Sequence, residues 1–193
     1  MKKVLIATTN PGKIREFQDL LTNRDLELIT PRDLKIEIEV VEDGSTYAQN
    51  AARKALAYAA ESGLITLADD SGLEVEVLDG APGIHSARFS SLPGATDADR
   101  RAALLQALEG KPAPWKARFH ATIAIAFPDG RLVFAEGECD GEIIAMERGS
   151  NGFGYDPIFF IPEMNKTMAE LSREEKNQIS HRARAAKSAM AWL

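Results

Sequence analysis

The spacing of apolar and polar residues along the chain predicts strands that alternate with helices. Short apolar runs with β-branched residues, which are typical of buried strands, occupy positions 4–7, 26–30 and 64–68. After Pro11, apolar residues instead recur every three or four positions, and the Ala-rich stretch 46–62 is strongly helical. This alternation favours an α/β protein in which helices pack on a sheet.

The second half of the chain adds further elements and a hairpin. Residues 117–127 and 131–138 flank a Pro-Asp-Gly turn at 128–130, which is the clearest hairpin signal in the sequence. Further strands are expected at 35–41 and 73–78, a helix at 97–108, and a polar helical tail from about residue 172 to the end. We therefore predict a mixed central sheet flanked by helices. No repeat, low-complexity tract or linker interrupts the chain, so we expect a single domain, 1–193.

Composition narrows the class of protein. The chain has 193 residues, of which 45% are hydrophobic and 27% charged, and its net charge is -6. This charge argues against non-specific binding to nucleic acid. Cys139 is the only cysteine, so no internal disulfide can form, and no apolar run approaches the roughly 20 residues that span a bilayer. We expect a cytoplasmic protein with neither nucleic acid nor a membrane as its partner.

The most informative chemical feature is a pair of adjacent carboxylates, Asp69 and Asp70. They follow the apolar run 64–68 directly, so we expect them where a buried strand ends. If the extended geometry persists, their side chains point in different directions. Two like charges beside a core need a cation or hydrogen bonds to compensate them, which suggests a metal-assisted reaction site. The alternative is a carboxylate that merely caps a turn.

A second candidate lies between the first strand and the first helix. Asn10 is suited to cap the helix and Pro11 to its first position. Main-chain N–H groups at such a helix start favour an anion, and Lys13 adds a positive charge, so the segment is a candidate phosphate site. An ordinary strand-to-helix turn is the alternative.

Two isolated charged residues belong to the same chemistry. Glu42 could add a metal-binding carboxylate, because Mg²⁺ often takes one or two carboxylates together with substrate phosphates and water. It could equally be part of a solvated turn. Lys54, on the Ala-rich helix, is either a phosphate ligand or a solvated helix residue, and its sequence context does not decide.

The last candidates lie near the C-terminus. In the segment 152–157, glycines flank Phe153 and Tyr155, which could stack on a flat ligand or belong to the core. Further along, Ser172 and Glu175 fit a capping box. On one unbroken helix Lys176, His181 and Arg182 would spread around the cylinder, so their convergence requires a break, for which Ser180 is a suitable N-cap. A charge-rich surface helix is the alternative.

The order of these motifs carries a resemblance to a known family. The motifs in succession are Thr9-Asn10-Pro11-Gly12-Lys13, Ala68-Asp69-Asp70-Ser71-Gly72-Leu73, Gly83-Ile84-His85-Ser86-Ala87-Arg88, Gly152-Phe153-Gly154-Tyr155-Asp156-Pro157 and Glu175-Lys176-Asn177 through Ser180-His181-Arg182. Over essentially its whole length the chain resembles the inosine triphosphate pyrophosphatase family, in particular the bacterial-type dITP/XTP pyrophosphatases.

The resemblance implies an elongated α/β fold with a cleft between two lobes, generally a homodimer. It implies Mg²⁺-assisted hydrolysis of ITP, dITP and XTP to the monophosphate and pyrophosphate, which cleanses the nucleotide pool. It also implies Asp70 as the general base, with Glu42, Asp69 and Asp70 as metal contacts or, for Asp69, as support. The substrate-binding residues implied are Thr8, Thr9, Asn10, Lys13, Lys54, Ser71, Phe153, Gly154, Tyr155, Asp156, Lys176, His181 and Arg182.

The implied chemistry leads to two further expectations and one alternative. A nearby cation is expected to keep the pKa of Asp70 low, so that orientation of the water matters more than basicity. Donors from His181, Arg182 or the backbone would favour a base with a carbonyl at its 6-position. The alternative function is a non-catalytic module that senses purine triphosphates, which would have no need for Asp69 and Asp70.

Overall fold

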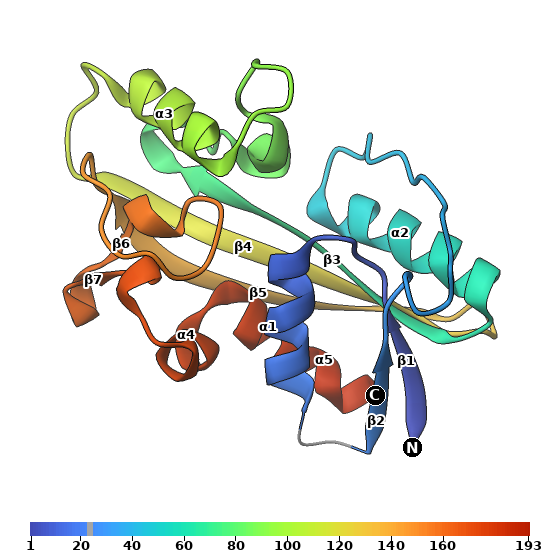
Figure 1. Ribbon diagram of the computed structural model, residues 1–193. Helices are drawn as coiled ribbons and strands as arrows, with labels where there is room; N and C mark the ends of the chain where they lie inside the picture. The colour runs from blue at the N-terminus through green and yellow to red at the C-terminus, as the bar shows by residue number, and fades with distance from the viewer. Residues whose placement is uncertain (23–24) are drawn as a thin grey trace. The chain divides into compact units, whose positions relative to one another are not determined.

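The computed structural model describes residues 1–22 and 25–193 (Figure 1). Its main elements are β1 (Lys2–Ile6), α1 (Pro11–Leu21), β2 (Leu26–Ile29), α2 (Tyr47–Ser62), β3 (Ile65–Val75), α3 (Asp97–Leu108), β4 (Trp115–Ala126), β5 (Leu132–Ile143), β6 (Phe159–Ile161), β7 (Lys166–Thr167), α4 (Arg173–Ile179) and α5 (His181–Ala189). Among these residues, no helix is long and apolar enough to cross a membrane.

The strands of the described residues form one mixed sheet in the order β2-β1-β3-β4-β5-β6-β7. Strand β1 runs parallel to both β2 and β3, whereas β6 runs antiparallel to β5 and β7. The predicted mixed α/β sheet flanked by helices is confirmed; the predicted cleft between lobes stays a prediction. The chain divides into two compact units. The first comprises Met1–Asp70, Ala121–Gly137 and Arg182–Leu193, and the second comprises Ser71–His120 and Glu138–His181.

In the first unit the two faces of β1 bury different helices. Val4 and Ile6 belong to a cluster with side chains of α1 and α5, while Leu5 and Ala7 belong to a cluster with side chains of α2. Because successive residues of a strand point to opposite faces, one short apolar strand supports both layers. Helix α2 therefore packs on the face opposite α1 and α5 (Figure 1).

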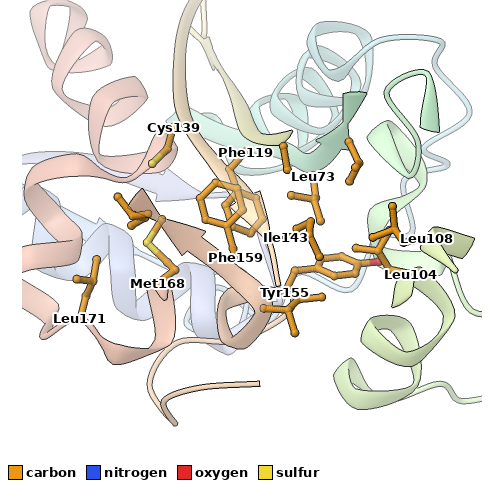
Figure 2. Close-up of a cluster of buried hydrophobic side chains, with 14 residues drawn as sticks. Leu73, Leu104, Leu108, Phe119, Cys139, Ile143, Tyr155, Phe159, Met168 and Leu171 are labelled. Atoms are coloured by element: carbon orange, nitrogen blue, oxygen red, sulfur yellow. The ribbon is translucent and has the colours of Figure 1, made fainter. Parts of the chain in front are cut away.

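The second unit has an aromatic core of its own. Figure 2 shows the Phe119 and Phe159 rings side by side, with centroids 4.4 Å apart, and Tyr155 directed toward Leu104 and Leu108. Phe159 is fully buried and Tyr155 nearly so. This cluster joins α3 to residues 155–159, which follow the glycine-rich loop 149–154, so it anchors the end of that loop.

Local capping signals predicted the helix ends well. Asn10 caps α1 with its side chain, Thr46 caps α2, and Gly63 ends α2 in the left-handed conformation. The break at Ser180 is also confirmed, since α4 ends before it and α5 begins at His181. His181 and Arg182 therefore occupy the first turn of a new helix.

Three strand predictions were wrong. Asp69 and Asp70 do not end a strand, because β3 continues through them to Val75, and the separate strand predicted at 73–78 does not exist. Residues 35–41 form no strand either. In that segment the alternating side chains of Ile36, Ile38 and Val40 pack against the α2-side cluster, so their period of two arises without strand pairing.

Truncation of a side chain in the core of the second unit is expected to destabilise the protein. Phe159→Ala removes a buried ring that contacts Phe119, and we expect it to lower the free energy of unfolding by about 3–5 kcal/mol. The matched control is Phe134→Ala, because the Phe134 side chain is 46% exposed, and a change within about 0.5 kcal/mol is expected. Urea unfolding followed by circular dichroism measures both, and equal losses would contradict this view of the core.

Candidate active site

Asp69 and Asp70 point to opposite faces of β3, as their alternation predicted. Asp69 Oδ2 lies 2.6 Å from Lys13 Nζ and 3.2 Å from Arg182 Nη2, on the face of α1 and α5. Asp70 Oδ2 accepts a hydrogen bond of 3.0 Å from Asn50 Nδ2 of α2, on the other face. The two carboxylates therefore have separate environments although they are neighbours in the chain.

The environment of Asp69 is a buried ionic network. Arg182, only 2% exposed, donates from Nη1 to Glu16 Oε2 at 2.5 Å and from Nη2 to Asp69. Burial alone would raise the pKa of Asp69, but the Arg182 and Lys13 charges outweigh it and hold this pKa well below its usual range. Asp69 is therefore ionised at neutral pH, where it pairs with Lys13.

Two amines converge on the main-chain carbonyl of Asp69. Lys54 Nζ donates to this oxygen at 2.8 Å and pairs with Glu42 Oε1 at 2.9 Å, while Lys13 Nζ lies 3.3 Å from the same oxygen. Burial, helped by the Arg182 and Lys54 charges, lowers the pKa of Lys13, although Asp69 opposes the shift. Two closely spaced ammonium groups suit a polyphosphate, because each can form a charge-assisted hydrogen bond with a phosphate oxygen.

The pKa of Asp70 is affected most by burial. Asp70 is 7% exposed, and burial raises its pKa, against the opposing Lys54 and Lys13 charges and the Asn50 hydrogen bond. Without a metal ion, burial outweighs both amines and Glu42 adds a like charge, so the low pKa expected beside a bound cation stays a prediction. A buried carboxylate with a raised pKa is a stronger proton acceptor than an exposed one.

The donor set suits Mg²⁺ if substrate supplies most of the ligands. Among the described residues, no group of three or more His, Cys, Asp or Glu side chains is arranged to hold a metal ion. Asp69 is turned toward Lys13 and Arg182, so Glu42 and Asp70 are the carboxylates left for this purpose. Mg²⁺ is commonly held by one or two carboxylates, substrate phosphates and water, and these residues fit that pattern.

The loop before α1 is more constrained than its sequence suggested. Asn10 Oδ1 accepts the N–H groups of Gly12 at 2.8 Å and Lys13 at 3.1 Å, so the capping side chain uses two donors of this helix start. Thr8 Oγ1 accepts the N–H of Asn10 at 3.2 Å. Thr8 and Thr9 also line an open groove of about 550 Å³ beside α1. Lys13 and the Thr hydroxyls are thus the clearer phosphate donors here.

In the second unit, Phe153, Asp156 and Lys176 lie together. Asp156 Oδ2 accepts from the N–H of Phe153 at 2.9 Å and from Lys176 Nζ at 2.6 Å. Lys176 Nζ in turn lies 5.3 Å from the centroid of the Phe153 ring, within cation–π range. A Cβ on Gly152 would lie 1.9 Å from Asp156 Oδ2, so only glycine fits this approach.

The remaining candidate residues differ in whether contacts within the protein already hold their side chains. Tyr155 is in the core, and its hydroxyl donates to Ser86 O at 2.9 Å, so Phe153 rather than Tyr155 is placed to stack on a base. His181 is stacked on Phe119 at 4.7 Å. Arg182 is held by Glu16 and Asp69 of its own unit. Ser71 follows Asp70 in β3, and Gly154 follows Phe153 in the loop.

The sequence interpretation missed two residues, Asn50 and Glu16. Asn50 is buried and bonded to Asp70, and Glu16 balances Arg182. The signal for Asn50 was its position on the buried face of α2, where Tyr47 and Ala51 also lie. Glu16 carried no such signal, since it stands among the polar residues of α1 and its partner lies 166 positions away.

Asp69→Asn is expected to destabilise the protein because it removes the carboxylate paired with Lys13 in a buried site and leaves Arg182 with Glu16 alone. A loss of about 3 kcal/mol in the free energy of unfolding at pH 7 is expected. The native pKa of Asp69 lies below its ordinary value of 3.8, so its contribution is complete above that value and is lost as the pH falls.

The pH dependence distinguishes this role from a general defect. Urea unfolding between pH 7 and pH 3 should show wild-type stability falling more steeply toward acid than that of Asp69→Asn. The control is Asp140→Asn, which loses a surface pair with Arg118 at 3.0 Å and should change little. Parallel pH curves for wild type and Asp69→Asn would contradict the buried network.

Comparisons with known proteins agree with this architecture. The family model described as "Ham1 family" matches residues 4–192. A dITP/XTP pyrophosphatase of Desulforamulus reducens is 49% identical over 99% of this chain and 95% of its own, and one of Geobacillus kaustophilus is 48% identical over 96% and 91%. The solved Ham1 protein of Staphylococcus aureus (40% identical, 99% and 97% covered) has a TM-score of 0.87, and that of Coxiella burnetii (38%, 100% and 98%) has 0.90. The chain belongs to the Ham1 family.

Proposed function

We propose that the protein is a nucleoside-triphosphate pyrophosphatase that converts non-standard purine nucleotides (ITP, dITP and XTP) to the monophosphate and pyrophosphate. Relatives named dITP/XTP pyrophosphatases, 46–49% identical over nearly their whole length, support this substrate class. The observation that carries the proposal is Asp70, a buried carboxylate of raised pKa in the same unit as two converging lysines. Residues 1–193 act as one domain, in a cytoplasmic homodimer.

Water attack at the α-phosphorus requires a base and charge neutralisation. Asp70 accepts the proton of the attacking water, and Asn50 orients the carboxylate through its Oδ2. Glu42 and Asp70 would hold Mg²⁺, which when bound supplies additional neutralisation of phosphate charge. Asp69 contributes indirectly, because it orients Lys13.

The triphosphate is bound by Lys13, Lys54 and residues next to them in the chain or in β3. Lys13 and Lys54 exchange their shared contact with the Asp69 carbonyl for phosphate oxygens, and the charge-assisted hydrogen bonds formed are stronger than those to a neutral carbonyl. The hydroxyls of Thr8 and Thr9 and the side-chain amide of Asn10 add donors. Ser71, directly after the base, is assigned to the substrate as well.

The purine is bound by residues of the second unit. Phe153 stacks on the purine ring. Lys176 contacts the Phe153 side chain, and Asp156 accepts hydrogen bonds from the Phe153 N–H and from Lys176. His181 offers a donor to the 6-carbonyl of hypoxanthine or xanthine, and an adenine amine would leave that donor unpaired. Arg182, the next residue of α5, is held by Glu16 and Asp69.

A panel of nucleotides tests the reaction class. ITP, dITP, XTP, ATP and GTP are incubated with and without Mg²⁺, and pyrophosphate and orthophosphate are measured separately. We expect pyrophosphate release that requires Mg²⁺ and is at least tenfold faster for ITP, dITP and XTP than for ATP, a ratio within the range of hydrogen-bond discrimination. Release of orthophosphate alone, or equal rates for ATP and ITP, would rule out the proposal.

Asp70→Asn tests the base. The variant keeps the size and the Asn50 neighbour but cannot take a proton, so kcat for ITP is expected to fall about 10²–10⁴-fold while KM changes little. The control Asp140→Asn, on the surface, should retain wild-type turnover. Unchanged kcat in Asp70→Asn would remove Asp70 from this role. Tight ITP binding without turnover by the wild-type protein in Mg²⁺ would favour the sensing module instead.

A further inference from the structure

The backbone on either side of Phe153 is anchored by hydrogen bonds. Before it, the main-chain N–H of Asn151 donates to Ala169 O at 3.0 Å and its side-chain amide donates to Leu171 O at 3.0 Å. The N–H of Phe153 itself donates to Asp156. The position of the Phe153 ring then depends on what holds the main chain of the next residue, Gly154.

Helix α3 holds Gly154 through both of its main-chain polar groups. Asp97 Oδ2 accepts the N–H of Gly154 at 2.8 Å, and Arg101 Nη1 donates to the carbonyl of Gly154 at 2.9 Å. Asp97 and Arg101 are four residues apart, so they lie on the same side of the helix. Neither residue has a part in the chemistry described above.

Both contacts come from side chains that are themselves fixed. Arg101 makes a bidentate pair with Glu147, with distances of 2.8 Å and 3.0 Å. Asp97 Oδ1 accepts from Arg100 Nη2 at 2.5 Å. The helix start is closed by the capping box of Thr96 and Asp99. Planar, two-point pairs of this kind restrict the direction of the remaining guanidinium donor.

Gly154 needs such a hold because of its conformation. Its φ is 63°, in the left-handed region, and it has no side chain that packing could retain. A Cβ built on it would have nothing within 4 Å, so its surroundings leave it room to move. The hydrogen bonds to its N–H and carbonyl therefore determine its orientation, and with it the direction of the adjoining Phe153.

We propose that Asp97 and Arg101 are positioning residues for base recognition. They clamp the main-chain N–H and carbonyl of Gly154 and so hold the Phe153 ring where it stacks on the purine. This inference rests on the proposed function, since it assigns Phe153 to the base. It adds to the reaction two residues of α3 whose effect is confined to ligands that carry a base.

Arg101→Met and Asp97→Ala test the clamp, since each removes one of the two contacts. Loss of base–aromatic stacking weakens binding by about tenfold, so KM for ITP and Ki for IMP are expected to rise about tenfold in each variant. Turnover at saturation should stay within about twofold, and Ki for pyrophosphate, which has no base, should not change. Asp97→Asn keeps an oxygen for the Gly154 N–H but loses the acceptor for Arg100, so its rise in KM and Ki should be smaller than that of Asp97→Ala.

The matched control is Arg118→Met, which removes a guanidinium bonded to the carboxylates of Glu138 and Asp140 in the same unit, away from the loop. It should leave all these constants unchanged. Equal rises in Ki for IMP and for pyrophosphate would contradict the proposal, because they would indicate a general disturbance. Unchanged Ki for IMP in Arg101→Met would contradict it as well.

Hydrogen–deuterium exchange separates this inference from the proposed function. Amides in a peptide covering residues 150–156 should exchange faster in Asp97→Ala and Arg101→Met than in wild type or Arg118→Met. Unchanged exchange would overturn the clamp whatever the enzyme hydrolyses. Absence of pyrophosphate release from ITP by the wild-type protein would instead overturn the proposed function.

Discussion

The first unit depends on how two adjacent buried carboxylates in one strand are compensated. Because β3 is extended, Asp69 and Asp70 face opposite ways and have different hydrogen-bond partners. At Asp69 the Arg182 and Lys13 charges outweigh burial and hold the pKa low, whereas at Asp70 burial outweighs the Lys54 and Lys13 charges and raises the pKa. Two residues of the same type thereby differ in how readily each takes a proton.

The Asp69 network is balanced in charge, which makes its burial tolerable. Glu16 and Asp69 contribute two negative charges, and Lys13 and Arg182 two positive ones, so each buried ion has an opposite neighbour. The network links α1, β3 and the first turn of α5. In the second unit Asp156 and Lys176 form a smaller buried pair, at 2.6 Å, beside the glycine-rich loop. Buried ion pairs thus position polar side chains in each of the two units.

Features set by nearby residues were predictable from the sequence, and features set by distant partners were not. The cap at Asn10 and the break at Ser180 rest on local chemistry, and both were predicted. The continuation of β3 was not, because two adjacent aspartates favour a turn locally and only distant Lys13 and Arg182 make burial of Asp69 acceptable. The strand-like alternation at 35–41 misled for the same reason, since its period reflects packing on a helix.

The candidate residues were found largely through their order in the chain, while their division of labour needed the structure. Asn50 and Glu16 belong to no motif, yet each hydrogen-bonds a motif residue. We propose that a water activated by Asp70 attacks the α-phosphorus. A single turnover of ITP in H₂¹⁸O with excess enzyme tests this step, with mass spectrometry of both products. We expect one ¹⁸O in the monophosphate and none in pyrophosphate. Label in pyrophosphate, or an unlabelled monophosphate with ¹⁸O in the protein, would contradict it.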